Sequence, residues 1–245
     1  MLTILIGRAK TGKSDTMLRR MAELGESSQQ ILLVPEHASH QAEVDVCRAC
    51  GDTASRHAEV LSFRRLGERV LSITGGIADV TLDNGGKLLT LQRALLETAP
   101  QMTVYRKPSQ KVGFLEQMLA LFDELRSYEV TPEILYQQAQ DIDGATHDKL
   151  TDLSLLYAAY EARLRRPGLD ARDRMTKLCD HLEESGYVRG KDIFIDGFTY
   201  FNAQERRALA IFLRQARSVT VTLLGEVNSR EEIFESTLKT MSMLE

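Results

Sequence analysis

An eight-residue segment near the start of the sequence has the residue types and spacing of a phosphate-binding loop. It fits the pattern G-x-x-x-x-G-K-[ST] at every position, and its residues are Gly7, Arg8, Ala9, Lys10, Thr11, Gly12, Lys13 and Ser14. In such a loop, backbone N–H groups and a helix N-terminus face the phosphates of a nucleotide and offset their charge. We expect Lys13 to reach the β- and γ-phosphates of ATP and the Ser14 hydroxyl to bind Mg²⁺. The alternative is a glycine-rich turn that only caps a helix.

A second ligand for Mg²⁺ is expected at the end of a neighbouring buried strand, where a carboxylate holds the ion through water. Asp196 fits this role because it directly follows the apolar run Ile193-Phe194-Ile195. This arrangement is typical of a Walker B element. The simpler interpretation is an acid at a strand end that caps the following turn.

The residue after Asp196 is Gly197. In hydrolysing helicases of superfamily 1 this position holds a Glu that orients the attacking water, so that group is missing here. Gln204 and Glu205 would replace it only if the turn brought them back toward the γ-phosphate. The sequence therefore favours nucleotide binding over turnover, and whether the chain is an enzyme stays open.

Apolar runs and helical patterns alternate at both ends of the chain. The runs cover residues 2–6, 31–34, 60–61, 193–195 and 219–224. Continuous apolar strands between helices predict a parallel α/β sheet covered on both faces. Strong helical periodicity in between predicts an inserted helical subdomain at 77–185, which leaves 1–76 and 186–245 for the α/β core. The last pattern is a helix with no closing element, so we expect a longer protein.

Composition excludes some classes of protein. The 245 residues include 31 Lys+Arg and 35 Asp+Glu, and the net charge of −4 argues against gripping nucleic acid through overall positive charge. Apolar runs fall short of the roughly 18 residues needed to span a bilayer, and the start has no cationic leader. Three Cys fit a reducing compartment. We expect a cytoplasmic chain with no membrane contact.

Four residues between 37 and 50 are of types that bind Zn²⁺. They are His37, His40, Cys47 and Cys50. The segment also has the apolar spacing of an amphipathic helix, and two cysteines three residues apart on a helix are more often packing residues. We therefore favour packing over a zinc site or a redox pair.

Arginines and aromatic residues in two regions are of types that contact DNA. They are Arg163, Arg165, Arg166, Arg172 and Arg174, together with Tyr157, Tyr160, Phe198, Tyr200 and Phe201. Arginines bind phosphates, and rings stack on bases. Interleaved acids favour a solvated mixed-charge surface for the arginines, and the spacing of the rings favours core packing.

Five stretches resemble one family, the B subunit of the bacterial ATP-dependent helicase/nuclease called AddB, in its firmicute form. They are GRAKTGKS at 7–14, LLVPEHASHQAEVDV at 32–46, VLSFRRLGERVL at 60–71, LDARDRM at 169–175 and IFIDGFTYFNAQE at 193–205. The last is the most specific, because a Walker B strand followed by Gly-Phe is unusual among helicases. The stretches occur in the order that the family has.

The resemblance implies a RecA-like P-loop NTPase fold of the superfamily 1 helicase kind, which binds ATP and has lost much of the motor machinery. It implies a heterodimer with the A subunit, whose motor drives unwinding, and a DNA substrate with double-strand ends and single strands. It places His37 and Gln41 in a segment equivalent to a DNA-contacting helicase motif. The family's second helicase-like domain, its nuclease domain and its iron–sulfur cluster match nothing in these residues.

Three functions remain in competition. The first is the ATP-binding, helicase-like part of a subunit that processes double-strand DNA ends for recombinational repair, with weak or no hydrolysis by this chain alone. The second is a P-loop kinase or phosphotransferase in which the helical insertion acts as a lid. The third is a scaffold with a vestigial P-loop.

Overall fold

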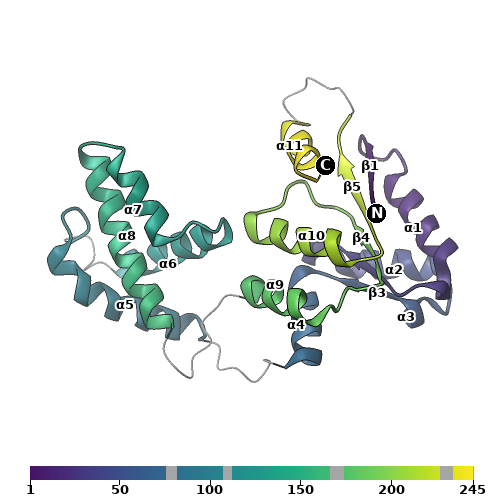
Figure 1. The fold of residues 1–245 in the computed structure, drawn as a ribbon, viewed down its shortest axis with the longest axis horizontal. Helices are drawn as coiled ribbons and strands as arrows, with labels where there is room; N and C mark the ends of the chain where they lie inside the picture. Colours follow the sequence, from purple (N-terminus) through teal and green to yellow (C-terminus); the bar gives the residue numbers. More distant parts are fainter. Residues whose placement is uncertain (76–81, 107–111, 166–173, 227–233, 245) are drawn as a thin grey trace. The chain divides into compact units, whose positions relative to one another are not determined.

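The computed structural model describes residues 1–75, 82–106, 112–165, 174–226 and 234–244. The chain forms two compact units. One comprises Met1–Ile77 and Arg174–Glu245, and the other comprises Ala78–Asp173. The first unit contains a sheet with helices, and the described part of the second is helical (Figure 1).

Five parallel strands form the sheet of the first unit. They are β1 (Leu2–Gly7), β2 (Gln30–Leu33), β3 (Ala58–Leu61), β4 (Asp192–Ile195) and β5 (Ser218–Leu224). Their order across the sheet is β1-β5-β4-β2-β3, and every neighbouring pair is parallel. The predicted α/β fold with a parallel sheet is confirmed, and it is of the RecA-like, helicase-like kind. In this order β5 separates the strand that leads into the glycine-rich loop from the strand that leads into Asp196.

Helices cover both faces of this sheet (Figure 1). They are α1 (Lys13–Leu24), α2 (Ser39–Cys50), α3 (Ala54–His57), α4 (Phe63–Thr74), α9 (Arg174–Ser185), α10 (Ala203–Gln215) and α11 (Glu235–Leu244), with short 3₁₀ turns η1 (Gly25–Ser27) and η2 (Glu36–Ala38). Strand β2 explains why the apolar runs are continuous. Its Ile31 and Leu33 pack with α4, α9 and α10, whereas Leu32 packs with α1 and α2. Successive side chains of a strand point to opposite faces, so a strand covered on both sides needs apolar residues throughout.

The second unit is built from α5 (Asn84–Thr98), η3 (Ala99–Gln101), α6 (Val112–Ser127), α7 (Pro132–Gln140) and α8 (Ala145–Leu164). The ring of Phe122 lies at the centre of its core and is fully buried. Its centroid is 4.6 Å from the Tyr157 ring and 5.9 Å from the Tyr160 ring, and both tyrosines are buried. These two rings therefore hold α6 to α8 and are not placed to stack on DNA bases.

One buried carboxylate organises the segment that follows η3. Asp152 of α8 accepts backbone N–H groups from Thr103 (3.0 Å), Val104 (2.7 Å) and Tyr105 (2.9 Å). Hydrogen bonds to a charged acceptor are stronger than neutral ones, and together they offset the cost of burying the charge. Residues 103–105 are thereby fixed to the middle of α8.

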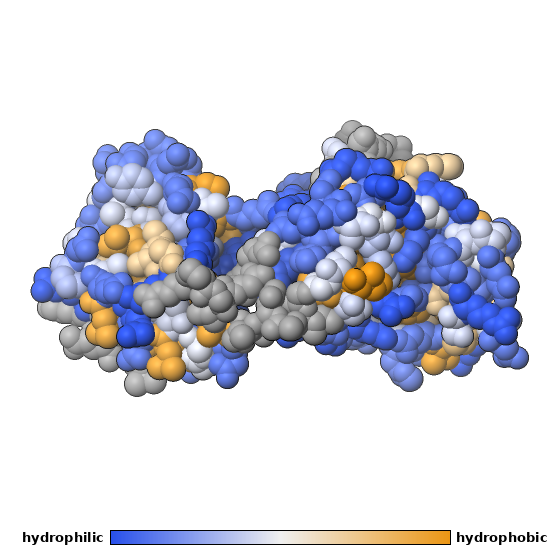
Figure 2. Space-filling model, turned by 60° about the horizontal axis from the view of Figure 1, so that its bottom comes forward, coloured by the Kyte–Doolittle hydropathy of each residue, from blue (hydrophilic) through white to orange (hydrophobic). Residues whose placement is uncertain are grey.

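The boundary between the units differs from the predicted insertion of 77–185. Helix α9 belongs with the sheet, because Leu178 and Leu182 are fully buried among residues of α4 and α10. Its helical periodicity resembles that of the preceding helices, so the pattern alone gave no reason to separate it. Hydrophilic residues cover most of the described surface in the view of Figure 2, with hydrophobic residues in separate patches.

Candidate nucleotide-binding site

The predicted phosphate loop joins the carboxyl end of β1 to the first turn of α1. Gly7 is the last residue of β1, and Lys13 is the first of α1. Two backbone positions in between are left-handed, Lys10 with φ of 60° and Gly12 with φ of 81°. A Cβ at Gly7 would lie 2.5 Å from the Thr11 hydroxyl oxygen, so a larger residue there would displace the Thr11 side chain. Both glycines of the motif are thus explained by local geometry.

Side chains within the motif hold the loop closed on itself. The Lys13 ammonium donates to the carbonyl oxygens of Gly7 (2.7 Å) and Arg8 (2.8 Å). The Thr11 hydroxyl also donates to the Arg8 carbonyl, at 2.8 Å. The Lys13 ammonium, which we expect to contact the β- and γ-phosphates, therefore lies inside the turn of the loop. The loop also places Ser14 in the first turn of α1.

Asp196 follows β4 at the same edge of the sheet. Its backbone N–H donates to the Leu33 carbonyl at 3.0 Å, and its carboxylate accepts a short hydrogen bond from the Thr222 hydroxyl. In the register of the sheet, Ile195 pairs with Val221 and Leu5 pairs with Thr222. Asp196 and Thr222 thus lie level with Leu5, two residues before the loop begins. Sequence reasoning missed Thr222, because a threonine inside a strand reads only as a strand former.

The side chains of Gln204 and Glu205 make hydrogen bonds to other groups. They would replace the missing Glu only if the turn after Asp196 brought them toward the γ-phosphate. The Glu205 carboxylate accepts the Asn202 N–H at 2.9 Å, and Asn202 Oδ1 accepts the Glu205 N–H at 2.9 Å, which is a capping box for α10. Burial raises the pKa of Glu205, and the bond from Asn202 partly opposes this. The Gln204 amide donates to Thr176 at 3.2 Å. Neither side chain is positioned to orient a water at the loop.

The segment after β5 lies directly against the phosphate loop. The Gly225 N–H donates to the Gly7 carbonyl at 3.1 Å. The next residue, Glu226, accepts from the Arg8 guanidinium through Nε (2.9 Å) and Nη2 (2.5 Å). The guanidinium carbon of Arg8 also lies 5.6 Å from the centre of the Phe234 ring. Sequence reasoning missed Glu226, since nothing in its neighbours marks it as a partner of a residue 218 positions earlier.

Charged residues at the ends of β2 and β3 form a second cluster at the same edge. Glu36 accepts from the Arg64 guanidinium at 2.5 Å and from the Ser62 hydroxyl in a short bond. These bonds, Arg64 first, lower the pKa of Glu36. Ser62 also caps α4, as its sequence position predicts, by accepting the Arg65 N–H. His37 is exposed in the middle of η2.

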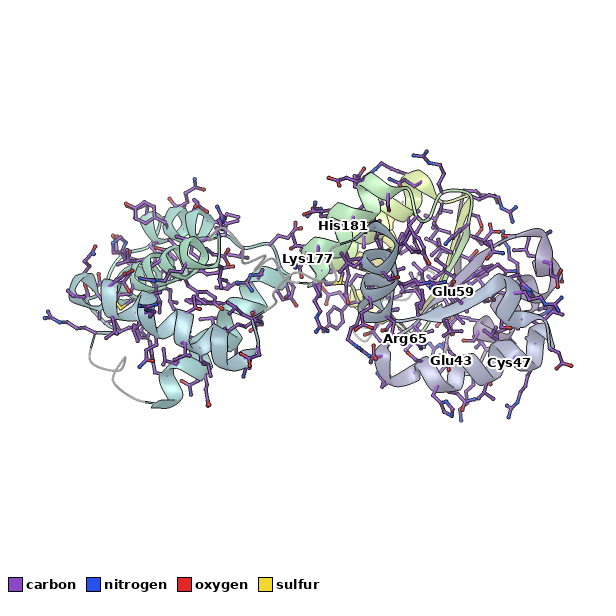
Figure 3. The ribbon with its side chains drawn as sticks, turned by 90° about the horizontal axis from the view of Figure 1, so that it is seen from below. Glu43, Cys47, Glu59, Arg65, Lys177 and His181 are labelled. Atoms are coloured by element: carbon purple, nitrogen blue, oxygen red, sulfur yellow. The ribbon has the colours of Figure 1, made fainter. Side chains whose placement is uncertain are left out.

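The four zinc-ligand types do not assemble. Among the described residues, no group of three or more His, Cys, Asp or Glu side chains is placed to hold a metal ion. Cys47 is exposed on α2, one turn after Glu43, which pairs with Arg65 at 2.6 Å (Figure 3). Burial and the nearby Cys47 raise the pKa of the Cys50 thiol. Cys50 is half-buried and packs against the core between α1 and α2, whereas the exposed Cys47 does not, so the packing prediction holds for only one of the two cysteines.

The remaining candidates for DNA contact differ in how far their side chains are exposed to solvent. Phe198 stacks on the buried Phe201 at 5.1 Å and meets Phe63 edge-on at 5.6 Å, whereas Tyr200 is 61% exposed. Arg163 is largely buried and pairs with Glu97. The side chains of Arg165 and Arg174 are exposed, and Arg166 and Arg172 lie outside the described residues.

Comparison with known proteins assigns a family. A family model described as "ADDB, N-terminal" matches residues 4–245. Among curated relatives, proteins named as the B subunit of an ATP-dependent helicase/deoxyribonuclease are 36% identical in Desulforamulus reducens, 30% in Clostridioides difficile and 31% in Clostridium kluyveri. The alignments cover 99%, 99% and 95% of this chain and 22%, 22% and 21% of the relatives.

The chain thus spans about a fifth of the length of these relatives. In the described part of the chain, no helix is long and apolar enough to cross a membrane. The match along nearly the whole chain agrees with the resemblance found in the five motif stretches. The chain belongs to the ADDB N-terminal family.

Proposed function

We propose that this chain binds ATP with Mg²⁺ at Gly7–Ser14 and forms the helicase-like part of a helicase/nuclease subunit that processes double-strand DNA ends. The observation that carries the proposal is the shape of the loop. It leaves a strand at a glycine closely approached by the Thr11 side chain, turns through two left-handed residues, and returns Lys13 to the carbonyls of Gly7 and Arg8. A loop of this kind directs backbone N–H groups toward phosphates.

Mg²⁺ binding is assigned to Ser14 and Asp196. The support is that both follow strands of one parallel sheet at its carboxyl edge, where ligands bind in open α/β folds. The Thr222 hydroxyl fixes one oxygen of Asp196 and leaves the carboxylate further acceptor capacity.

Hydrolysis by this chain alone is proposed to be weak or absent. Gly197 follows Asp196, and Glu205 is committed to the cap of α10. Neither position therefore supplies the carboxylate that would orient the attacking water.

The DNA-processing role and the partner rest on the relatives. Their name includes a helicase, a deoxyribonuclease and a B subunit, so we propose DNA as the substrate and an A subunit as the partner of the longer protein. The same names favour this function over the kinase with a helical lid.

Calorimetric titration of Mg-ATP into the wild type and Lys13→Ala tests the proposal. A charge-assisted contact contributes about 1.5 to 3 kcal/mol, so we expect Lys13→Ala to weaken binding about 10- to 100-fold. Lys149→Ala removes an equal charge from an exposed position of the helical unit and should bind as the wild type does. No affinity in the wild type would instead favour the scaffold, and phosphate transfer to a small acceptor would favour the kinase.

A further inference from the structure

A carboxylate stands next to the phosphate loop, where it would oppose the binding of an anion. Glu226 is fixed there twice: its own side chain accepts from Arg8, and the neighbouring Gly225 N–H is bound to the Gly7 carbonyl. A carboxylate beside a phosphate site weakens binding unless a cation neutralises it or it moves away. Arg8 is that cation, and it belongs to the loop itself.

The pair is connected to the Lys13 ammonium through Arg8. The Lys13 ammonium, which in this motif reaches the β- and γ-phosphates, lies 2.8 Å from the Arg8 carbonyl. The side chain that leaves the same residue carries the guanidinium that holds Glu226. A γ-phosphate would therefore approach this ion pair more closely than an α-phosphate would.

The ion pair is weak enough to be exchanged. The side chains of Arg8 and Glu226 are 55% and 52% exposed, and pairs so exposed contribute little because water screens them. A phosphate offers the guanidinium more negative charge than a carboxylate does, in a geometry that suits bidentate bonding. Competition for Arg8 would thus favour a phosphate over Glu226.

Arg8 also connects the loop to α11. Its guanidinium carbon lies 5.6 Å from the centre of the Phe234 ring, within range of a cation–π contact, and Phe234 is only 6% exposed. Phe234 directly precedes α11, and α11 is tied to β5 by the bond from the Thr237 hydroxyl to the Leu224 carbonyl at 2.6 Å. A change at Arg8 would alter the surroundings of Phe234.

We propose that Arg8 makes the site discriminate nucleoside triphosphate from diphosphate: the γ-phosphate takes its guanidinium from Glu226, whose competition weakens triphosphate binding, and changes its contact with Phe234. The inference rests on the proposed nucleotide site and adds a specificity-determining residue to it. In the diphosphate complex the pair stays closed. In the triphosphate complex Glu226 is released, and α11 senses the exchange through Phe234.

Calorimetry of Glu226→Gln with Mg-ATP and Mg-ADP tests the discrimination. Removing the competing charge should tighten ATP binding about 3- to 10-fold and change ADP binding less than about twofold. Glu26→Gln is the matched control, because Glu26 pairs with Arg56 in a similarly exposed ion pair elsewhere in the sheet unit, and neither affinity should change. An equal effect of Glu226→Gln on both nucleotides, or none on either, would overturn the proposal.

A fluorescent reporter tests the link to α11 separately. The chain contains no Trp, so Phe234→Trp introduces a single indole beside Arg8. Its emission should shift on addition of Mg-ATP and stay unchanged with Mg-ADP. The same response to both nucleotides would contradict the exchange at Arg8.

The experiment separates this inference from the proposed function. If the wild type binds ATP and Lys13→Ala binds it more weakly, the nucleotide site stands. An unchanged ATP-to-ADP preference in Glu226→Gln then removes only the role of the ion pair. If the wild type binds neither nucleotide, the site itself is wrong and the inference is wrong with it.

Discussion

The hydroxyl of Thr222 on β5 donates a hydrogen bond to the carboxylate of Asp196 at the end of β4. Strand β5 lies between β4 and β1, so the acid assigned to Mg²⁺ is held by the strand that neighbours the one leading into the loop. This hydrogen bond connects two strands that adjoin the site, and the sequence alone did not predict it. It also leads to a test of the metal assignment.

Replacing Thr222 by Val should weaken the dependence of ATP binding on Mg²⁺. The substitution keeps the branched shape and removes the hydroxyl that orients Asp196, and the lost bond should reduce the free energy of unfolding by about 1 kcal/mol. Titrations with and without Mg²⁺ measure the first effect, and urea denaturation measures the second.

Thr220→Val is the matched control for that substitution. Thr220 is fully buried on the same strand, and its hydroxyl has no hydrogen-bond partner within the part of the chain that the structure describes. Removing an unpaired buried hydroxyl should leave stability equal or slightly higher and leave Mg²⁺ dependence unchanged. Equal loss of Mg²⁺ dependence in both variants would contradict the role of Thr222.

Substitution should destabilise the loop at one of its two left-handed residues and not at the other. Gly12→Ala forces a Cβ into a φ of 81° and should lower the free energy of unfolding by about 1 to 2 kcal/mol. Lys10→Gly relieves a non-glycine residue at φ of 60°, so it should cost nothing despite the greater freedom of glycine in the unfolded chain. Chemical denaturation of the two variants checks this, and a larger loss from Lys10→Gly would show that its backbone is not left-handed.

Asp152 should dominate the stability of the helical unit. Asp152→Asn removes the charge that accepts three backbone N–H groups and should cost about 2 to 4 kcal/mol. The effect should be confined to the thermal transition of that unit if the two units unfold separately. Asp143→Asn, at an exposed position of the same unit, should change stability by less than about 0.5 kcal/mol.

The sheet unit should lose stability in acid partly through Asp192. Burial raises the pKa of this carboxyl, but bonds from Arg217, Ser218 and Ser28 outweigh burial and lower it overall. A lowered folded-state pKa stabilises above the unfolded value of 3.8, and that contribution disappears as the pH falls through the folded-state value. Denaturation of the wild type and Asp192→Asn between pH 7 and pH 3 should give curves that converge at the acid end. Parallel curves would mean that Asp192 does not titrate in this way.

An exposed ring beside the site should contribute to single-strand binding. Tyr200 is 61% exposed four residues after Asp196, whereas Phe198 and Phe201 pack against each other. Stacking on a base contributes about 1 to 3 kcal/mol, so Tyr200→Ala should weaken binding of an oligo-dT at low salt about tenfold by fluorescence anisotropy. Tyr136→Ala, which removes a ring of 52% exposure from the helical unit, is the control. Equal losses in both variants would remove the special role of Tyr200.

Local patterns predicted the sheet well because its strands are buried on both faces. A run such as 193–195 has to be apolar throughout, and Asp196 then marks where the strand ends. The helical pattern wrongly assigned α9 to the inserted subdomain. Helical periodicity shows which face of a helix is buried, but it does not show which unit covers that face. The spacing of the rings correctly favoured core packing for Tyr157, although the contact of this ring with Phe122 could only be found in the fold.

The missed partners of the site share one physical reason. Thr222 and Glu226 act through contacts between residues far apart in the chain, and the sequence pattern contains only local spacing. The phosphate loop was different, because its glycines and lysine meet within eight residues. Local chemistry therefore predicted the loop, while the contacts of Thr222 and Glu226 required the fold.

The central claim is that the amide groups between β1 and α1 bind the phosphates of ATP. A crystal structure of the chain grown with Mg²⁺ and a non-hydrolysable ATP analogue tests it most directly. We predict phosphates inside the loop, the Lys13 ammonium moved from the carbonyls of Gly7 and Arg8 onto the phosphate oxygens, and Mg²⁺ between Ser14 and Asp196. A nucleotide bound elsewhere, with Lys13 still on those carbonyls, would contradict the claim.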